Sequence, residues 1–277
     1  MTTRRQFLAT AAAAATLARA ARLKTIGVQL YTVRTILPQK PEEVLKAIRA
    51  IGYQDIEATF AGFDKMWPAV QASGLKPVSM HLDNKMVMRG GDELARAVDS
   101  LKQYGFQYAV HPYVSPEDRG GADVMKTLAE KLNHLGELAK NAGMQAAYHN
   151  HAFEFAKNGD GTLFDVLADN TDKKLVGFEV DIFWVSVAGL DPAEFIRKHK
   201  GRALLVHLKD KAAGTEQRFN ESVPRTAFKE VGSGTLDWPG ILEAASESGV
   251  KQYFVEQDQT PGDPIESLRE SFAYLSK

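Results

Sequence analysis

Four acidic or imidazole side chains stand at the ends of apolar runs in this sequence. Glu154 lies in "YHNHAFEF", Asp181 ends "VGFEVD", His207 ends "ALLVH" and Glu256 ends "QYFVE". The first two intervals between them are each close to one strand-plus-helix unit, and the third adds a polar loop. Such groups in one pocket would repel one another unless a cation neutralised them. The set suits one divalent metal ion, with Mn²⁺ as first choice and Mg²⁺, Zn²⁺ or Co²⁺ as alternatives.

Each of these residues also has a structural interpretation when it is taken alone. Asp181 and Glu256 could be ion-paired residues of a protein core, and His207 could be a core histidine bonded to a backbone carbonyl. The concentration of polar groups at successive strand ends favours a functional site instead. Five of the seven histidines stand at such ends, namely His81, His111, His149, His151 and His207.

The elements that must position these side chains are eight short apolar runs, which alternate with amphipathic helical patterns. The predicted strands are residues 25–33, 53–59, 76–82, 107–113, 144–151, 175–182, 203–209 and 252–257. Eight strand-plus-helix units without a linker predict a closed (β/α)8 TIM barrel, in which the active site lies at the carboxyl ends of the strands. A doubly wound α/β sheet is the alternative fold.

Composition narrows the class of partner. The chain has 277 residues, of which 44% are hydrophobic and 25% charged, a size typical of one such barrel. The formal net charge is −1, so there is no broad basic field for nucleic acid or an anionic membrane, and a small-molecule substrate is expected. The absence of cysteine excludes disulfides, thiolate metal sites and cysteine nucleophiles. The oligomeric state is left open, with a homo-oligomer as one option.

The first twenty residues, "MTTRRQFLATAAAAATLARA", predict an export signal. The stretch "TRRQFL" resembles the twin-arginine consensus, an alanine-rich apolar stretch follows, and "ARA" at 18–20 offers a cleavage site. The alternatives are an alanine-rich amphipathic helix and an uncleaved anchor. We therefore expect a signal peptide at 1–20 and a barrel domain at 21–277. The mature protein is expected to be periplasmic or secreted, with no stable membrane association after cleavage.

Six motifs carry a resemblance to a known family. "GVQLYTVR", "YHNHAFEF", "EVDIFWV", "HLKD", "VGSGTLDW" and "VEQD" are similar to motifs of the sugar phosphate isomerase/epimerase family of xylose isomerase-like TIM barrels, over roughly residues 26–276. The resemblance implies one divalent metal held by Glu154, Asp181, His207 and Glu256. It also implies isomerisation or epimerisation of a keto-sugar or related hydroxy-carbonyl compound, through proton abstraction next to the carbonyl and a metal-bound enediolate. In the ketose epimerases the strand-five and strand-eight glutamates are the acid/base pair, which assigns that role to Glu154 and Glu256.

The other strand-end residues are predicted to bind a carbohydrate substrate. They are Tyr31, Glu57, His81, His111, His151, Trp184 and Lys209. Trp184 would form an apolar wall against a sugar face. Lys209 has two interpretations, as a group that stabilises an oxyanion or as a partner in a salt bridge of the barrel. The sequence has no glycine-rich phosphate loop, so a phosphorylated substrate is not implied.

One position departs from the family pattern. Trp184 stands three residues after Asp181, where the ketose epimerases and the apurinic-site endonucleases of the superfamily often have histidine. This difference argues against C3 epimerisation of free ketoses and against DNA repair. Two other functions therefore stay open: a lyase or hydratase acting on 3-keto-glycosides or inosose-like ketones, and a non-catalytic sugar-binding barrel.

Overall fold

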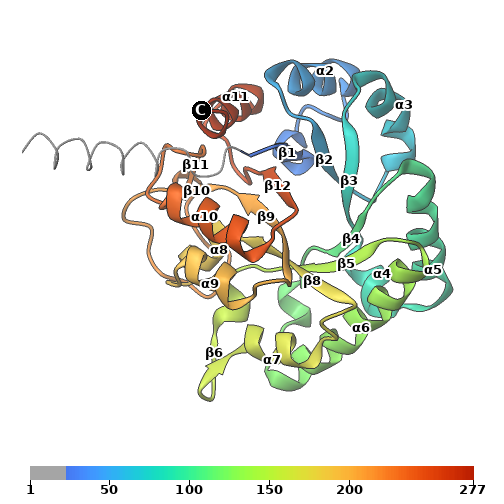
Figure 1. The fold of residues 1–277 in the computed structure, drawn as a ribbon, viewed down its shortest axis with the longest axis vertical. Coiled ribbons are helices and arrows are strands. Elements are labelled where there is room, and N and C mark those ends of the chain that lie inside the picture. The colour runs from blue at the N-terminus through green and yellow to red at the C-terminus, as the bar shows by residue number, and fades with distance from the viewer. Residues whose placement is uncertain (1–22) are drawn as a thin grey trace, which may run out of the picture.

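Residues 23–277 fold around a closed barrel of eight parallel strands, as described by a computed structural model (Figure 1). The strands follow in the order β1-β2-β3-β4-β5-β8-β9-β12, and β12 pairs with β1 to close the barrel. Their bounds are β1 Gly27–Gln29, β2 Asp55–Thr59, β3 Lys76–His81, β4 Tyr108–His111, β5 Gln145–His149, β8 Val176–Asp181, β9 Ala203–Leu208 and β12 Gln252–Val255. The predicted (β/α)8 TIM barrel is confirmed. The predicted signal peptide at 1–20 lies outside the described residues.

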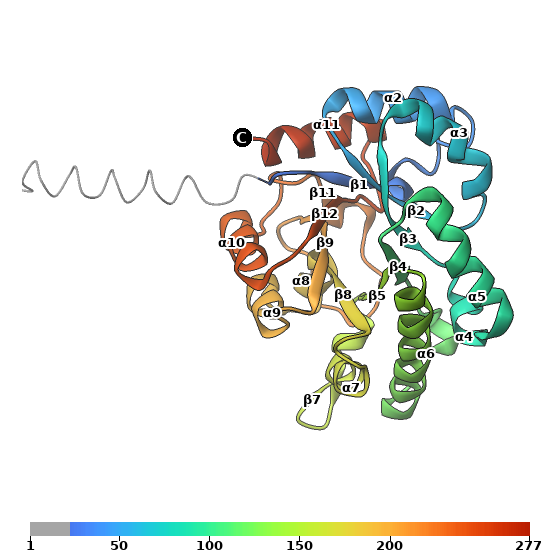
Figure 2. The ribbon, with the colours of Figure 1, turned by 45° about the vertical axis from the view of Figure 1, so that its right-hand side comes forward.

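Helices ring the strands on the outside of the barrel (Figure 2). Their bounds are α2 Pro41–Ile51, α3 Phe63–Ser73, α4 Asn84–Arg89, α5 Gly91–Ser100, α6 Ala122–Asn141, α7 Leu163–Asn170, α8 Ile182–Val187, α9 Pro192–Lys198, α10 Trp238–Ser248 and α11 Pro264–Leu275. Each long helix buries one apolar face, as Leu128, Leu132 and Leu135 of α6 do at helical spacing. Across residues 23–277, no helix combines the length and apolar character needed to cross a membrane.

Short elements complete the loops. They are the 3-10 helices η1 Leu30–Val33, η2 Leu101–Tyr104, η3 Pro116–Asp118, η4 Phe153–Phe155 and η5 Arg225–Ala227, with the two-stranded sheets β6 Lys157–Asn158/β7 Gly161–Thr162 and β10 Asp210–Lys211/β11 Phe228–Lys229. The predicted strand 25–33 is shorter than expected, because η1 begins after Gln29, whose side chain accepts a hydrogen bond from the Tyr31 backbone N–H. The predicted strand 144–151 ends at His149, so loop geometry sets the directions of His151 and Glu154.

The barrel interior has an apolar layer followed by a polar one. The apolar cluster inside the barrel comprises Val78, Tyr108, Val110, Ala147, Leu205 and Phe254. Gly27 leaves room for the ring of Phe254, because a Cβ at this position would lie 2.4 Å from Phe254 Cδ1. Nearer the carboxyl ends of the strands stand the buried polar residues, which include His81, His149, Glu179 and His207. The apolar layer thus closes the barrel on one side of the polar residues.

Two strand pairs contain a register shift of one residue next to these polar side chains. The shift between β2 and β3 makes Val78 an extra residue of β3, and the shift between β8 and β9 makes Leu204 an extra residue of β9. Side chains alternate between the two faces of a strand, so one extra residue reverses the face of every side chain that follows it. His81 and His207 come after these shifts, which turn them toward the barrel interior.

Candidate functional site

Asp181, His207 and Glu256 meet where β8, β9 and β12 end. One donor atom from each lies within 4.8 Å of the others, and all three side chains are buried. His207 Nδ1 lies 2.9 Å from Glu256 Oε2. Asp181 also begins α8, because its Oδ1 accepts hydrogen bonds from the backbone N–H groups of Phe183 and Trp184. The structure thus brings together three of the four residues that the sequence predicted as metal ligands.

A buried lysine joins the two carboxylates of this trio. Lys209 Nζ lies 2.8 Å from Asp181 Oδ2, 2.6 Å from Glu256 Oε2 and 2.8 Å from Asp258 Oδ2. Burial alone would lower the pKa of Lys209, but these carboxylates outweigh it and raise the pKa well above its ordinary value. Burial raises the pKa of Asp181 to about 6, whereas Lys209 and His207 overcome burial at Glu256 and lower its pKa. The salt bridge that was one interpretation of Lys209 is present.

A second buried network shares His207 with the trio. Glu179 Oε2 lies 2.7 Å from His81 Nε2, 3.1 Å from His149 Nδ1 and 3.3 Å from His207 Nε2. Glu57 Oε2 lies 3.0 Å from His81 Nε2 and also within hydrogen-bond distance of His207 Nε2. Burial opposes a charge on His81, but Glu57 and Glu179 outweigh it and raise the pKa of His81 to about 9. Donor atoms of His81, His149, Glu179 and His207 lie within 4.8 Å of one another.

A cavity of about 670 Å³ opens beside both clusters. Its polar lining includes Tyr31, His81, Tyr113, His149, His151, Lys209, Glu256 and Asp258, and Trp184 and Phe228 add aromatic surface. A volume of several hundred Å³, with apolar walls and a few convergent polar groups, is typical of a site for a small molecule. The polar groups come from strand ends and the loops after them, where active sites of this fold lie.

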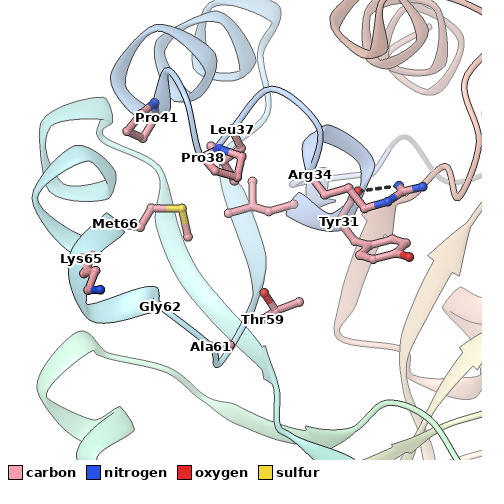
Figure 3. A pocket seen from close by; sticks show the side chains of 11 residues that line it. Tyr31, Arg34, Leu37, Pro38, Pro41, Thr59, Ala61, Gly62, Lys65 and Met66 are labelled. Atoms are coloured by element: carbon pink, nitrogen blue, oxygen red, sulfur yellow. Dashed lines mark hydrogen bonds between the residues drawn. The ribbon is translucent and has the colours of Figure 1, made fainter. Parts of the chain in front are cut away.

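A smaller pocket of about 360 Å³ adjoins this cavity, because Tyr31, Thr59 and Ala61 line both. Figure 3 shows its side chains, among them Leu37, Pro38, Pro41 and Met66. The Arg34 guanidinium lies 4.0 Å from the centre of the Tyr31 ring and donates a hydrogen bond to the Tyr31 backbone oxygen. The pocket is therefore an apolar extension beside the polar cavity.

Glu154 lies apart from the trio, in contrast to the prediction that it is a fourth ligand. It stands in η4, where its Oε1 accepts hydrogen bonds from the Tyr148 hydroxyl at 2.6 Å and the His151 backbone N–H at 3.0 Å. Its Oε2 lies 3.0 Å from the same His151 nitrogen. Burial raises the pKa of Glu154 to about 7, against these hydrogen bonds, which lower it. The turn of the chain after β5 directs this carboxylate to local partners instead of to Asp181, His207 and Glu256.

Five of the seven predicted substrate contacts line the cavity: Tyr31, His81, His151, Trp184 and Lys209. The other two do not. Glu57 is fully buried in the network with His81 and His207. His111 follows the inward-facing Val110 and pairs in register with Tyr148, and the His111 and Tyr148 ring centres are 5.9 Å apart. Strand alternation therefore turns His111 away from the barrel interior, and burial lowers its pKa to about 4.

The "HLKD" and "VGSGTLDW" motifs have a structural role that their sequences alone did not reveal. Asp210 accepts hydrogen bonds from the backbone N–H groups of Gly232, Gly234 and Leu236, and from the Trp238 indole N–H at 2.6 Å. A Cβ on Gly234 would lie 2.3 Å from Asp210 Oδ1, so only glycine fits there. Asp210 thus fixes the glycine-rich loop against the end of β9, next to Lys209.

Sequence reasoning did not assign His149, Glu179 or Asp258 to the site. Glu179 stands two residues before Asp181 on β8, so strand alternation could have placed both on one face. His149 is the last residue of β5 and was named only as a member of a polar group. Asp258 lies beyond β12, where no periodic pattern predicts the direction of a side chain.

The donor set fits a divalent cation. Two carboxylates and an imidazole converge in a buried site without sulfur ligands, a combination that suits Mn²⁺, Mg²⁺ or Zn²⁺. Within the described residues, Glu57 Oε1 and Glu179 Oε1 are buried and have no hydrogen-bond partner. Buried carboxylates with too few donors are costly unless positive charge is close by. A metal at the trio would add that charge.

Comparison with known proteins gives a family for this fold. Residues 17–277 match the model of the xylose isomerase-like TIM barrel family. Inosose dehydratase of Clostridium perfringens is 31% identical over 162 residues, which cover 55% of this chain and 54% of that protein. The chain thus spans about half the length of the curated relatives it matches.

Solved structures give matches over nearly the whole chain. A sugar phosphate isomerase/epimerase from Parabacteroides distasonis superposes with a TM-score of 0.76 at 25% identity, covering 93% of this chain and 95% of that one. The 3-keto-D-glucoside 4-epimerase of E. coli superposes with a TM-score of 0.65 at 18% identity, covering 91% and 98%, a likeness of fold. By their names, these three proteins are enzymes that act on sugars or inososes.

Proposed function

Because this chain belongs to the xylose isomerase-like TIM barrel family, we propose that it is a divalent-metal-dependent isomerase or epimerase of a keto-sugar or related hydroxy-carbonyl compound. The observation that carries the proposal is the convergence of Asp181, His207 and Glu256 with Lys209 beside the cavity. A proton next to a carbonyl becomes easier to remove when the negative charge that develops on the oxygen is stabilised. A metal site and a buried ammonium group together suit that task.

Asp181, His207 and Glu256 would hold the metal, with Mn²⁺ as first choice and Mg²⁺, Zn²⁺ or Co²⁺ as alternatives. When bound, the ion would polarise a substrate carbonyl and its neighbouring hydroxyl. Lys209 contacts both carboxylates and lines the cavity, so its ammonium is placed to stabilise negative charge on a substrate oxygen. Trp184 offers an aromatic face to a sugar ring from the cavity wall.

Glu256 and His151 are the groups in the cavity lining that we assign to proton transfer. The lowered pKa of Glu256 keeps it ionised and therefore able to accept a proton. Burial and the nearby Lys209 charge hold the pKa of His151 well below its ordinary value, so its imidazole is neutral at pH 7. Glu154 accepts the His151 backbone N–H and thereby positions this residue.

The proposed function predicts metal-dependent exchange of a carbon-bound proton with solvent. The protein is stripped with a chelator, reloaded with each of the four metals, and incubated in D₂O with keto-sugars, cyclitol ketones and 3-keto-glycosides. Deuterium is expected at the carbon next to the carbonyl in reloaded samples and to be absent from stripped controls. Sugar binding without exchange under every metal would contradict the proposal and favour a non-catalytic sugar-binding barrel.

A lyase or hydratase acting on inosose-like ketones or 3-keto-glycosides is the second candidate. The curated relatives favour it, and so does the position of Glu154 outside the cavity lining, which leaves Glu256 without the second glutamate of an epimerase pair. Elimination needs a base for the proton and an acid for the departing group, and the apolar pocket gives room for the substituent of a glycoside. Mass spectrometry of the same incubations separates the two reactions, because epimerisation conserves mass and elimination releases water or the substituent.

We also propose that the protein is exported by the twin-arginine route and acts in the periplasm. The motivation is the "TRRQFL" stretch followed by "ARA" at 18–20. The exported chain is expected to begin at Ala21, and a variant with both Arg4→Lys and Arg5→Lys is expected to stay in the cytoplasm. Mass spectrometry of the periplasmic fraction measures both. Unimpaired export of the double variant would show that another route is used.

A further inference from the structure

We propose that His149 is the metal ligand contributed by β5, through its Nε2 atom, and that Glu179 and Glu57 are positioning residues that aim His149 and His207 at the metal. This inference rests on the metal that the proposed function requires. It replaces Glu154 in the predicted ligand set and gives two imidazoles and two carboxylates. Under this arrangement Glu57 and Glu179 support the ligands of one ion and do not bind an ion of their own.

The two ring nitrogens of His149 face different carboxylates. Nδ1 lies 3.1 Å from Glu179 Oε2, and Nε2 lies 3.6 Å from Asp181 Oδ2. The first distance is a hydrogen bond, and an ionised carboxylate can only accept, so Nδ1 carries the proton and Nε2 keeps its lone pair. Two ligand atoms bound to one ion at about 2.1 Å lie roughly 3.0–3.4 Å apart. The separation of Nε2 from Asp181 is therefore close to that of two ligands of the same ion.

His207 has the same arrangement with its nitrogens exchanged. Its Nε2 faces Glu57 Oε2 and Glu179 Oε2, while its Nδ1 lies 2.9 Å from Glu256 Oε2. Nε2 thus donates to Glu57 and Glu179, and Nδ1 donates to Glu256, so Nδ1 is the nitrogen that would give up its proton to bind the metal beside Glu256. When a carboxylate accepts a hydrogen bond from the ring nitrogen that does not bind the metal, it fixes the tautomer and the ring orientation of the histidine and raises the basicity of the other nitrogen.

Glu57 and Glu179 are themselves held in place by neighbouring side chains. Gln29 Nε2 donates a hydrogen bond of 2.8 Å to Glu57 Oε2, and the Tyr31 backbone N–H donates to Gln29 Oε1, which sets the orientation of the amide. His81 Nε2 contacts both Glu57 and Glu179 and spans the gap between them. These contacts make Glu57 and Glu179 a rigid support for the two histidines.

Glu154 has no comparable path to the metal. Both of its oxygens are held by the His151 backbone N–H, and one also by the Tyr148 hydroxyl. His149 is the last residue of β5 and lines the cavity, and its Nε2 faces Asp181. The ring centres of His149 and His207 are 4.6 Å apart and the ring planes are inclined by 64°, so the two imidazoles are in edge-to-face contact.

Pulsed EPR of bound Mn²⁺ tests the ligand set in the unmodified full-length protein. With histidine labelled by ¹⁵N, two imidazole nitrogens are expected to couple to the ion, one from His149 and one from His207. Coupling to a single nitrogen would overturn the inference, and so would two ions per chain, since the second network would then be a metal site of its own. A protein that binds no divalent ion would instead remove the proposed function itself.

Variants assign the second nitrogen by Mn²⁺ affinity, measured by competition with a chelating dye. His149→Ala and, as a second variant in case the first does not fold, His149→Asn are expected to lose one coupled nitrogen and to bind at least ~10-fold more weakly. Glu179→Gln is expected to bind ~10–100-fold more weakly, because a support of the imidazole is lost, while keeping both nitrogens. Glu154→Gln is the matched control and should bind within about threefold of wild type. Weak binding by Glu154→Gln, with normal binding by the His149 variants, would restore Glu154 as the ligand.

Discussion

Replacing Glu256 by glutamine is expected to abolish most turnover while leaving the barrel folded. The amide keeps the size of the side chain and one oxygen, but it cannot accept a proton. A positioned acid or base contributes on the order of 10²–10⁴ in rate, so the rate of deuterium exchange next to the carbonyl should fall by at least that amount. The Glu256→Gln variant also loses a negative charge beside Lys209 and His207, so any weakening of the metal site would add to the loss.

A buried glutamate outside the cavity provides the control for this experiment. Glu230 is buried and accepts a hydrogen bond of 2.7 Å from the Ser267 hydroxyl, yet it does not line the cavity. Glu230→Gln should therefore retain the wild-type exchange rate. If Glu256→Gln also exchanges at the wild-type rate, the assignment of proton transfer to Glu256 is wrong. Glu154→Gln keeps an oxygen that can accept the His151 N–H, so an equal collapse in this variant would support the paired glutamates that the sequence predicted.

The second large expected effect is a loss of metal affinity. Asp181→Asn keeps the oxygen that begins α8 but removes the negative charge, so the helix should persist while Mn²⁺ affinity falls by about 100-fold or more. His207→Ala should cause a similar fall, because it removes a donor atom that faces Glu256. Elemental analysis after chelation and reloading, combined with dye competition, measures both losses.

Asp191 offers a matched control for the aspartate. It begins α9 in the same way, with hydrogen bonds from the backbone N–H groups of Ala193 and Glu194, but it is exposed and does not line the cavity. Asp191→Asn should leave metal content unchanged. Undiminished metal content in both Asp181→Asn and His207→Ala would rule out the proposed site.

The sequence predicted the barrel and much of the site because both follow from strand periodicity. Alternating apolar runs and helices fix a (β/α)8 order, and residues that end such runs reach the same end of the barrel. Asp181 ends β8, His207 is the last residue but one of β9, and Glu256 follows β12 directly, so their convergence could be predicted from spacing.

Spacing along the chain did not determine the position of a side chain where the periodic pattern stops, or where the face of the strand decides its direction. Glu154 follows the end of β5 by five residues, and the intervening turn decides its direction. His111 ends β4, but the alternation of side chains along the strand turns it away from the barrel interior, which Val110 faces. Glu57 contacts His81 and His207, and it does not line the cavity. These outcomes depend on three-dimensional neighbours that a single sequence does not display.

Because β3 and β9 each contain one extra residue, the directions of the His81 and His207 side chains depend on the number of residues in these two strands. Deleting Leu204 would restore even pairing between β8 and β9 and rotate His207 out of the interior, although no residue of the site would be changed. A substitution that keeps an apolar side chain at this position would preserve that direction, and Gly177 leaves the space in which Leu204 packs. Related barrels that differ by one residue in these strands would therefore present different side chains to the same cavity, so insertion and deletion within a strand can alter the chemistry of this site without any catalytic substitution.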